Sequence, residues 1–154
     1  MSAPVSGPAS APGLVHRFSI RAEVGPYRRV GDVVGGVLQV IPITGGTVTG
    51  AGLDGEVLDG GADWAVFRPD GSVLVEARYQ IRTAAGTIID ILNTGLAGRP
   101  ADGEEVPSYF PTSPTFRTDV EEHRWLLDSL FLGWARVTPE ATTIEVFEVL
   151  APPA

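Results

Sequence analysis

Apolar and polar residues alternate along the middle of the chain, from residue 62 to residue 95, with two short interruptions. Alternation with a period of two is typical of a β-strand that buries one of its faces. The interruptions are Asp70-Gly71 and Ala85-Gly86. Asp-Gly between two alternating runs is a strong signal for a β-hairpin. The segment therefore predicts three consecutive antiparallel strands joined by two tight turns.

Other segments carry further strand signals and one helix signal. Strands are expected at residues 14–24, 30–43, 130–137 and 142–150, a proline-rich loop at 97–114, and a short helix at 119–128. Many short strands that bend at glycines predict an all-β fold, namely a single closed antiparallel β-barrel of about eight strands, calycin- or lipocalin-like, with the helix as a cap. We expect this domain to span residues 14–151, after a disordered Pro/Ala/Ser tail at residues 1–13.

Composition and charge exclude several classes of function. The formal net charge is −8, so the chain lacks the basic surface that binding to nucleic acid or to an anionic membrane requires. There is no cysteine, and His16 and His123 stand far apart, so we expect no disulfide and no metal site. No apolar run reaches the ~18 residues that cross a bilayer. The first thirteen residues do not resemble a secretory signal, and we expect a cytoplasmic protein.

The stretch GAGLDG, residues 50–55, fits the G-x-G-x-x-G fingerprint of dinucleotide-binding folds. That fingerprint needs a strand before it and a helix after it, because the helix N-terminus holds the pyrophosphate. Another glycine pair, Gly60-Gly61, follows soon after, so no helix can begin and continue there. We interpret these glycines as corners of the barrel, and we expect no bound nucleotide and no other cofactor.

The two tight turns also predict a register for the three central strands. If each turn holds two residues, Asp63 faces Arg78, and Arg78 faces Asn93. Glu76 then lies two residues further along on the same side. This register places carboxylate, guanidinium and amide groups in one row across three strands.

Longer stretches resemble the domain-of-unknown-function 3237 family of small bacterial and fungal proteins. They are IPITGGTVTGAGLDGEVLDGGADW, EARYQIRT, YFPTSPTF and WLLDSLFLG, and the similarity covers nearly all of residues 14–149, with GGADW and the Arg-Tyr pair of EARY as its most specific pieces. The resemblance implies a closed antiparallel barrel of the calycin type with a pocket, but no general reaction. Two positions depart from it. Pro111 stands where the family usually has an arginine, and Arg99 is the nearest arginine to the family's N-x-G-x-R, of which Asn93 and Gly95 remain.

The row of polar groups supplies the candidate catalytic residues, which are Asp63, Glu76 and Arg78. A carboxylate removed from water has a raised pKa and can act as a general acid or base. An arginine beside it can keep a partner ionised or stabilise an oxyanion on a ligand. The alternative is that this row faces solvent and that the more apolar side, with Trp64 and Tyr79, faces the interior. Alternation alone leaves both open, although the family motif includes Asp63, Arg78 and Tyr79.

Aromatic and polar residues supply the candidate substrate-binding set. Its members are Trp64, Tyr79, Asn93, Tyr109, Trp125, Trp134 and Arg136. The aromatic rings could form a stacking wall for a planar ligand, and the alternative is ordinary core and lid packing. Arg136 either reaches the lumen to hold an anion or turns outward. For His123 we favour an exposed position on the helix over a role as proton shuttle at the barrel mouth.

Two functions of different classes fit these observations. The first is a cofactor-independent enzyme, of isomerase, cyclase or lyase type, that acts on a hydrophobic small molecule by acid/base groups in the barrel lumen, for instance in secondary metabolism. The alternative is a barrel that binds or carries such a molecule without changing it. A third hypothesis is a homo-oligomer formed through an apolar outer face. Titratable groups in the lumen would favour the enzyme, and a purely apolar lumen would favour the carrier.

Overall fold

The computed structural model describes residues 10–154, and most of the predicted disordered tail, residues 1–9, lies outside the described residues. The elements follow one another as β1 (Gly13–Val24), β2 (Arg28–Val33), β3 (Gly36–Gly50), β4 (Gly55–Val57), β5 (Gly61–Phe67), β6 (Val73–Thr83), β7 (Ile88–Ala97), β8 (Pro111–Arg117), the 3-10 turn η1 (Glu121–His123), α1 (Trp125–Asp128), β9 (Phe131–Val137) and β10 (Ala141–Leu150). No helix within residues 10–154 is long and apolar enough to span a membrane.

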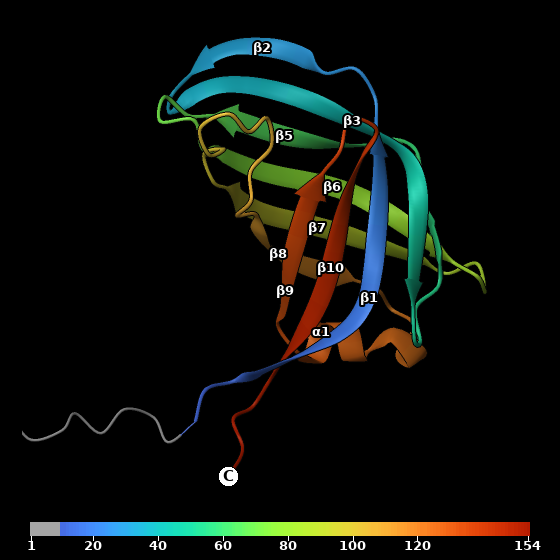
Figure 1. The fold of residues 1–154 in the computed structure, drawn as a ribbon. Helices are drawn as coiled ribbons and strands as arrows, with labels where there is room; N and C mark the ends of the chain where they lie inside the picture. Colours follow the sequence, from blue (N-terminus) through green and yellow to red (C-terminus); the bar gives the residue numbers. More distant parts are fainter. Residues whose placement is uncertain (1–9) are drawn as a thin grey trace, which may run out of the picture.

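The strands close into the predicted antiparallel barrel (Figure 1). Neighbours run in the order β1, β10, β9, β8, β7, β6, and pairing of β1 with β3 closes the ring. Between β6 and β3 a single position is shared by two short strands, since β4 and β5 each pair with both. β2 pairs with β3 alone and lies outside the ring. Without β2, the other nine strands therefore fill eight positions around the barrel, which confirms the all-β prediction.

The GAGLDG stretch is the corner between β3 and β4. Gly50 ends β3, Gly55 begins β4, and the Gly50 N–H donates a hydrogen bond to the Asp54 carboxylate at 3.0 Å. No helix follows, so the structural context of a dinucleotide loop is absent at these residues. The interpretation of these glycines as a barrel corner is confirmed.

The two central hairpins hold three residues in each turn rather than two. The Arg68 N–H donates to the Ser72 carbonyl at 2.9 Å, and the Thr83 N–H donates to the Thr87 carbonyl at 2.8 Å. Each turn ends on a glycine with a left-handed φ, 89° at Gly71 and 90° at Gly86, which other L-residues adopt at a cost. A type I turn followed by such a glycine is the usual geometry of three-residue hairpins.

The third turn residue corrects the predicted register by one position. Asp63 pairs with Ala77, and Ala77 pairs with Asn93, whereas Arg78 pairs with Ala62 and with Leu92 of β7. Because side chains alternate between faces, a shift of one residue moves a side chain to the opposite face. Asp63 and Asn93 therefore share a face from which Arg78 and Glu76 are excluded. The register of the last hairpin is as predicted, with Arg136 opposite Thr143 and Trp134 opposite Glu145.

The short helix covers one end of the barrel, as predicted (Figure 1). Beneath it the barrel is filled by aromatic rings in edge-to-face contact. Trp125 lies 6.2 Å from Phe18 and 5.9 Å from Phe131 between ring centroids, and Phe116 contacts both phenylalanines. Such packing leaves no room for a ligand at this end. The expectation that His123 is exposed is wrong, because its ring is buried against this end of the barrel.

Candidate functional site

A cavity of about 420 Å³ occupies the half of the barrel away from the helix. It exists because inward positions that could carry large residues carry alanine instead. Ala22 of β1, Ala65 of β5, Ala77 of β6 and Ala135 of β9 all line it. Aliphatic side chains, including Ile41, Val73, Val75, Val137 and Ile144, complete a largely apolar wall. Its volume is in the range of pockets for small organic ligands.

The loop between β7 and β8, residues 98–110, covers the cavity. Its two ends are fastened by the Gly98 N–H, which donates to the Tyr109 carbonyl at 2.7 Å, and by the Ala135 N–H, which donates to the Phe110 carbonyl at 2.8 Å. Between them Glu105, Val106 and Pro107 line the cavity. The loop is thus a roof that is anchored at its base and contributes Val106 and Phe110 to the binding space.

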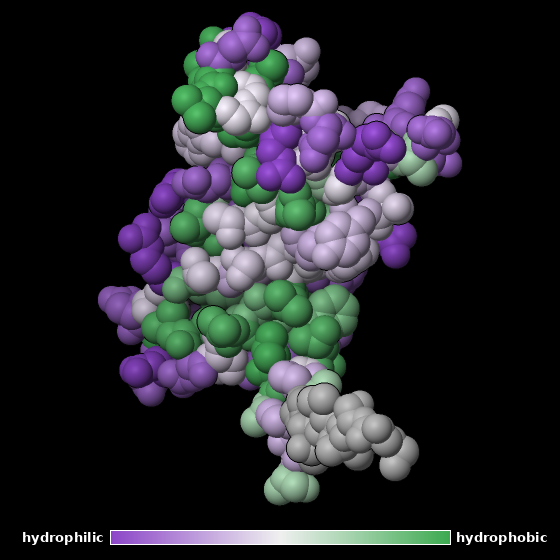
Figure 2. Space-filling view, turned by 90° about the vertical axis from the view of Figure 1, so that its left-hand side faces the viewer, coloured by the Kyte–Doolittle hydropathy of each residue, from purple (hydrophilic) through white to green (hydrophobic). Residues whose placement is uncertain are grey.

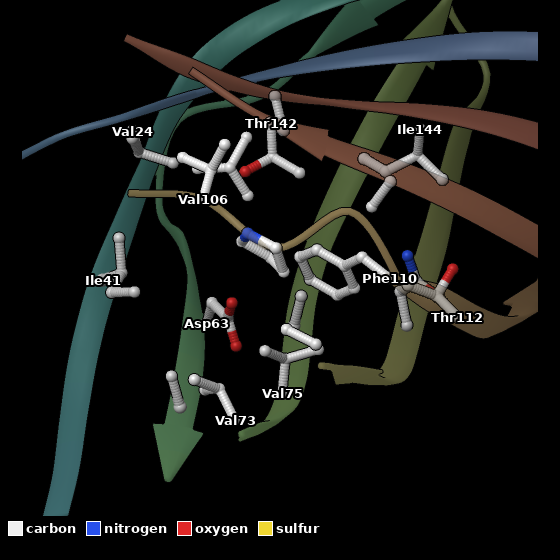
Figure 3. Close-up of a pocket in the computed structure, with 18 of the residues that line it drawn as sticks. Val24, Ile41, Asp63, Val73, Val75, Val106, Phe110, Thr112, Thr142 and Ile144 are labelled. Carbon is white, nitrogen blue, oxygen red and sulfur yellow. The ribbon is translucent and has the colours of Figure 1, made fainter. Parts of the chain in front are cut away.

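Asp63 of β5 is the acidic group of the inner wall. Figure 3 shows its carboxylate pointing into the space between Val106 and the two valines of β6. Burial raises the pKa of Asp63 to about 6, an effect that the hydrogen bond from the Glu76 N–H opposes and the nearby charge of Glu76 reinforces. Asp63 therefore exchanges a proton near neutral pH, which is the property that a general acid or base requires.

Three polar side chains on the next three strands also line the cavity. They are Tyr79 of β6, Asn93 of β7 and Thr112 of β8. The Tyr79 hydroxyl, the Asn93 amide oxygen and the Thr112 hydroxyl are buried without a hydrogen-bond partner. Burial, and secondarily the negative charge of Asp63, raise the pKa of Tyr79, so its hydroxyl stays protonated and able to donate. Buried polar groups without partners are rare in native proteins, and here they surround a space that a ligand can fill.

The predicted row of four polar residues is thus divided between two faces. Asp63 and Asn93 line the cavity, as does Tyr79, although their functional roles stay predictions. The expectation that Glu76 and Arg78 face the lumen is wrong, because the extra turn residue places them outside, where the Arg78 guanidinium lies 3.3 Å from the Glu76 carboxylate and both side chains are about half exposed. Trp64, one residue after Asp63, also faces outward and is 41% exposed.

The other predicted binding residues lie away from the cavity. Tyr109 and Trp134 contact each other edge to face at 5.5 Å between ring centroids, on the outer side of the roof and of β9. Arg136 follows two residues later on the same outer face, near Glu145, whose pKa is lowered mainly by the hydrogen bond from Ser19 and to a smaller extent by the charge of Arg136. Trp125 belongs to the aromatic core at the helix end. None of these four residues is among those that line the cavity, and their predicted roles in substrate binding stay predictions.

Sequence reasoning missed Thr112, Phe110 and the roof residues. Thr112 sits in an alternating run with Pro114 and Phe116, so a strand with Thr112 inward could have been inferred from Phe116. Glu105 and Val106 carried no such signal, because a proline-rich loop has no periodicity that indicates which side chains face a cavity.

The outer surface has its own distribution of apolar side chains. Figure 2 shows hydrophobic residues gathered over the lower half of one face, beside the N-terminal end of the described chain. Exposed leucines of this kind are Leu14 on β1, Leu132 on β9 and Leu130 just before it. The predicted homo-oligomer stays a prediction, which light scattering on the purified protein would test.

Comparison with known proteins identifies a family model and several similar chains. The family model described as protein of unknown function (DUF3237) matches residues 12–149. A UPF0311 protein of Rhodopseudomonas palustris is 35% identical over 143 residues, which cover 86% of this chain and 94% of that protein. The crystal structure of a conserved protein of unknown function from the same species matches with a TM-score of 0.86 at 34% identity, covering 91% of this chain and 99% of that one.

A more distant match carries a description of a different kind. The crystal structure described as an enzyme from Penicillium herquei superposes with a TM-score of 0.72 at 26% identity. The match covers 94% of this chain and 98% of that one. The barrel and its loops therefore correspond over almost the whole length of both proteins.

Proposed function

The chain belongs to the DUF3237 family, whose description assigns no reaction, and we propose from its pocket that it is a cofactor-independent enzyme of isomerase, cyclase or lyase type acting on a hydrophobic small molecule. The observation that carries this proposal is Asp63, a carboxyl group with a pKa of about 6 in the wall of an apolar cavity. Maintaining a partly buried carboxylate costs stability, and strongly perturbed groups in clefts are concentrated at functional sites.

The arrangement supports transfer of a proton within one substrate molecule. Ionised Asp63 removes a proton from a substrate carbon next to a carbonyl group, and the electron pair of the broken C–H bond moves into an enolate. The Tyr79 hydroxyl donates a hydrogen bond to the enolate oxygen, as Asn93 can through its amide N–H groups. Protonated Asp63 then returns the proton to another atom of the same substrate. Protons and electrons balance in this step without a cofactor.

The likeness to the Penicillium herquei structure supports the catalytic hypothesis, since that protein is described as an enzyme. The apolar lining supports the second candidate, a binding or carrier barrel, because most of the wall can only exclude water and fill space. The two candidates differ in one respect that can be measured, which is whether the bound molecule leaves the barrel unchanged. A cytoplasmic place of action remains part of the proposal.

Native mass spectrometry of the purified protein, followed by extraction of any retained ligand, is the first experiment. The extracted molecule and its close precursors are then incubated with the parent, with Asp63→Asn and with Glu76→Gln. We expect Asp63→Asn to lower turnover by about 100-fold or more while it still binds the ligand. Glu76→Gln removes a carboxylate of the outer face and should retain turnover. Equal turnover by the parent and Asp63→Asn would exclude Asp63 as the proton carrier, and an unchanged ligand in all incubations would favour the carrier.

A further inference from the structure

The ionisable groups of the cavity wall are all acidic. Asp63 and Glu105 line the cavity, and no arginine or histidine within residues 10–154 does. The chain contains no lysine, so its eleven basic residues are all arginines. Six of these arginines pair with carboxylates elsewhere, such as Arg17 with Glu148 and Arg117 with Asp90. Arg99 lies between the lining residues Gly98 and Pro100, with its side chain against Gly71, but does not itself line the cavity. A carboxylate or phosphate beside Asp63 would therefore meet no cation among the described lining residues that offsets the repulsion.

The unpartnered atoms of the wall define what the ligand must supply. The Asn93 amide oxygen can only accept a hydrogen bond, and the hydroxyl oxygens of Tyr79 and Thr112 accept as well as donate. Ionised Asp63 is also an acceptor. The Asn93 oxygen cannot donate, so a ligand that fills the cavity must bring at least one hydrogen-bond donor, because a buried acceptor that gains no donor weakens binding strongly.

The register fixes how these acceptors are spread. Asp63 and Asn93 stand in one inner row on either side of Ala77, so their strands are separated by two strand spacings, roughly 10 Å. Thr112 lies opposite Gly95, one inward position further from the helix end than Asn93. The small Ala77, which lines the cavity between Asp63 and Asn93, leaves the space between these two groups open. A flat apolar frame with hydroxyl groups near its ends matches this spread.

We infer that the ligand is an uncharged molecule that carries hydroxyl groups on an apolar ring frame, and that the cavity rejects organic anions. This inference rests on the proposed function, since it assumes that the cavity is the ligand site. The hydrocarbon wall around Asp63, with Ile41, Val73 and Val75, also disfavours a cationic ligand there, because such a ligand would lose most of its hydration and find Asp63 as its carboxylate partner in that wall, while Glu105 belongs to the roof. Neutral donors satisfy Asn93, Thr112 and Tyr79 without that loss.

Four matched probes test the inference on the intact protein. They are 2-naphthol, 2-methoxynaphthalene, which cannot donate a hydrogen bond, 2-naphthoate, which is an anion, and 2-naphthylmethylammonium, which is a cation. Dissociation constants are measured by ligand-observed NMR at pH 8, where Asp63 is ionised. We expect 2-naphthol to bind most tightly, the methyl ether about 10-fold more weakly, and the carboxylate about 100-fold more weakly.

Two variants separate the charge of Asp63 from other causes. Asp63→Asn keeps the size of the side chain and should reduce the discrimination against 2-naphthoate by about 10-fold or more. Glu76→Gln removes an equal charge from the outer face. Loss of that charge can only lower the pKa of Asp63, which is already ionised at pH 8, so this variant should leave the discrimination as in the parent. Tighter binding of the carboxylate or the ammonium than of 2-naphthol, or unchanged discrimination in Asp63→Asn, would overturn the inference about ligand charge while the cavity remains a binding site. Equal binding of the methyl ether would overturn the requirement for hydroxyl groups. Absence of binding by all four probes would overturn the inference and also count against the proposed function.

Discussion

The backbone N–H of Glu76 donates a hydrogen bond of 3.2 Å to the carboxylate of Asp63, while the side chain of Glu76 lies on the opposite face of the sheet. One residue thus both supports and opposes the ionised form of Asp63. Its N–H lowers the pKa of Asp63, and its charge raises it. Burial is the largest effect and leaves the pKa of Asp63 at about 6, well above the ordinary value of 3.8.

The raised pKa of Asp63 predicts how the contribution of this residue to the free energy of unfolding changes with pH. The folded protein binds the Asp63 proton more tightly than the unfolded chain does, so protonation of Asp63 stabilises the fold. This stabilisation is fully present below pH 3.8 and is lost as the pH rises through about 6. Asp63→Asn should therefore be more stable than the parent at pH 8, by about 1–3 kcal/mol, and equal to it near pH 4. Urea unfolding of both proteins at the two pH values measures the difference, in which contributions from all other groups cancel. A variant that is less stable at pH 8 would contradict the effect of burial.

Arg78 should contribute little to the free energy of unfolding, because it lies on the outer face of the barrel. Its ion pair with Glu76 is about half exposed on both sides. Exposed pairs of this kind stabilise proteins by ~0–1 kcal/mol, so Arg78→Ala should unfold in urea almost as the parent does. A loss of about 3 kcal/mol, as expected for an arginine that neutralises a buried carboxylate, would show that Arg78 faces the interior after all.

Filling the space between Asp63 and Asn93 should abolish binding without unfolding the barrel. Ala77→Leu adds three carbon atoms that point into the cavity, where no atom is displaced. We expect a change in unfolding free energy within about 1.5 kcal/mol and at least about 10-fold weaker binding of 2-naphthol. Arg78→Leu is the matched control, because it places the same side chain on the outer face and should leave binding unchanged. Unimpaired binding by Ala77→Leu would place the ligand elsewhere.

Shortening an aromatic side chain at the helix end of the barrel should lower stability strongly, whereas filling the cavity at the other end should not. Phe131 is 2% exposed and contacts Phe116 and Trp125, so Phe131→Ala should cost about 3–5 kcal/mol. Leu132, its neighbour on β9, is 41% exposed, and Leu132→Ala should cost about 1 kcal/mol or less. Thermal and urea unfolding of the two variants compare them directly. Similar losses for both would mean that the aromatic rings do not hold this end of the barrel together.

The strands could be predicted from the sequence because their signals are local. Alternation and the glycine turns were enough to place β5, β6 and β7 side by side. Whether a turn holds two or three residues depends on the conformation of Pro69 and Ala84, which alternation does not encode. Both turns differ from the prediction by one residue in the same direction, so Asp63 and Asn93 stay in one row while Arg78 leaves it.

The cavity itself could not be predicted in this way. Its volume results from Ala22, Ala65 and Ala135, which come together only after β1, β5 and β9 have closed the ring. An alanine inside a strand looks the same in the sequence whether it packs against a large neighbour or leaves a space. The unpartnered atoms of Tyr79, Asn93 and Thr112 are equally invisible before the fold is known.

The loop of residues 98–110 contributes to the cavity wall, whereas the strands form the barrel, so the two can be changed separately. One backbone hydrogen bond, from Gly98 to Tyr109, closes the loop at its base, and Pro100, Glu105, Val106 and Pro107 between them line the cavity. Doubling the length of a flexible loop between fixed ends costs only about 0.6 kcal/mol in closure entropy. Residues 99–108 can therefore be exchanged, lengthened or shortened at small energetic cost, and this segment is where a new ligand preference can be engineered while the eight-position barrel stays as it is.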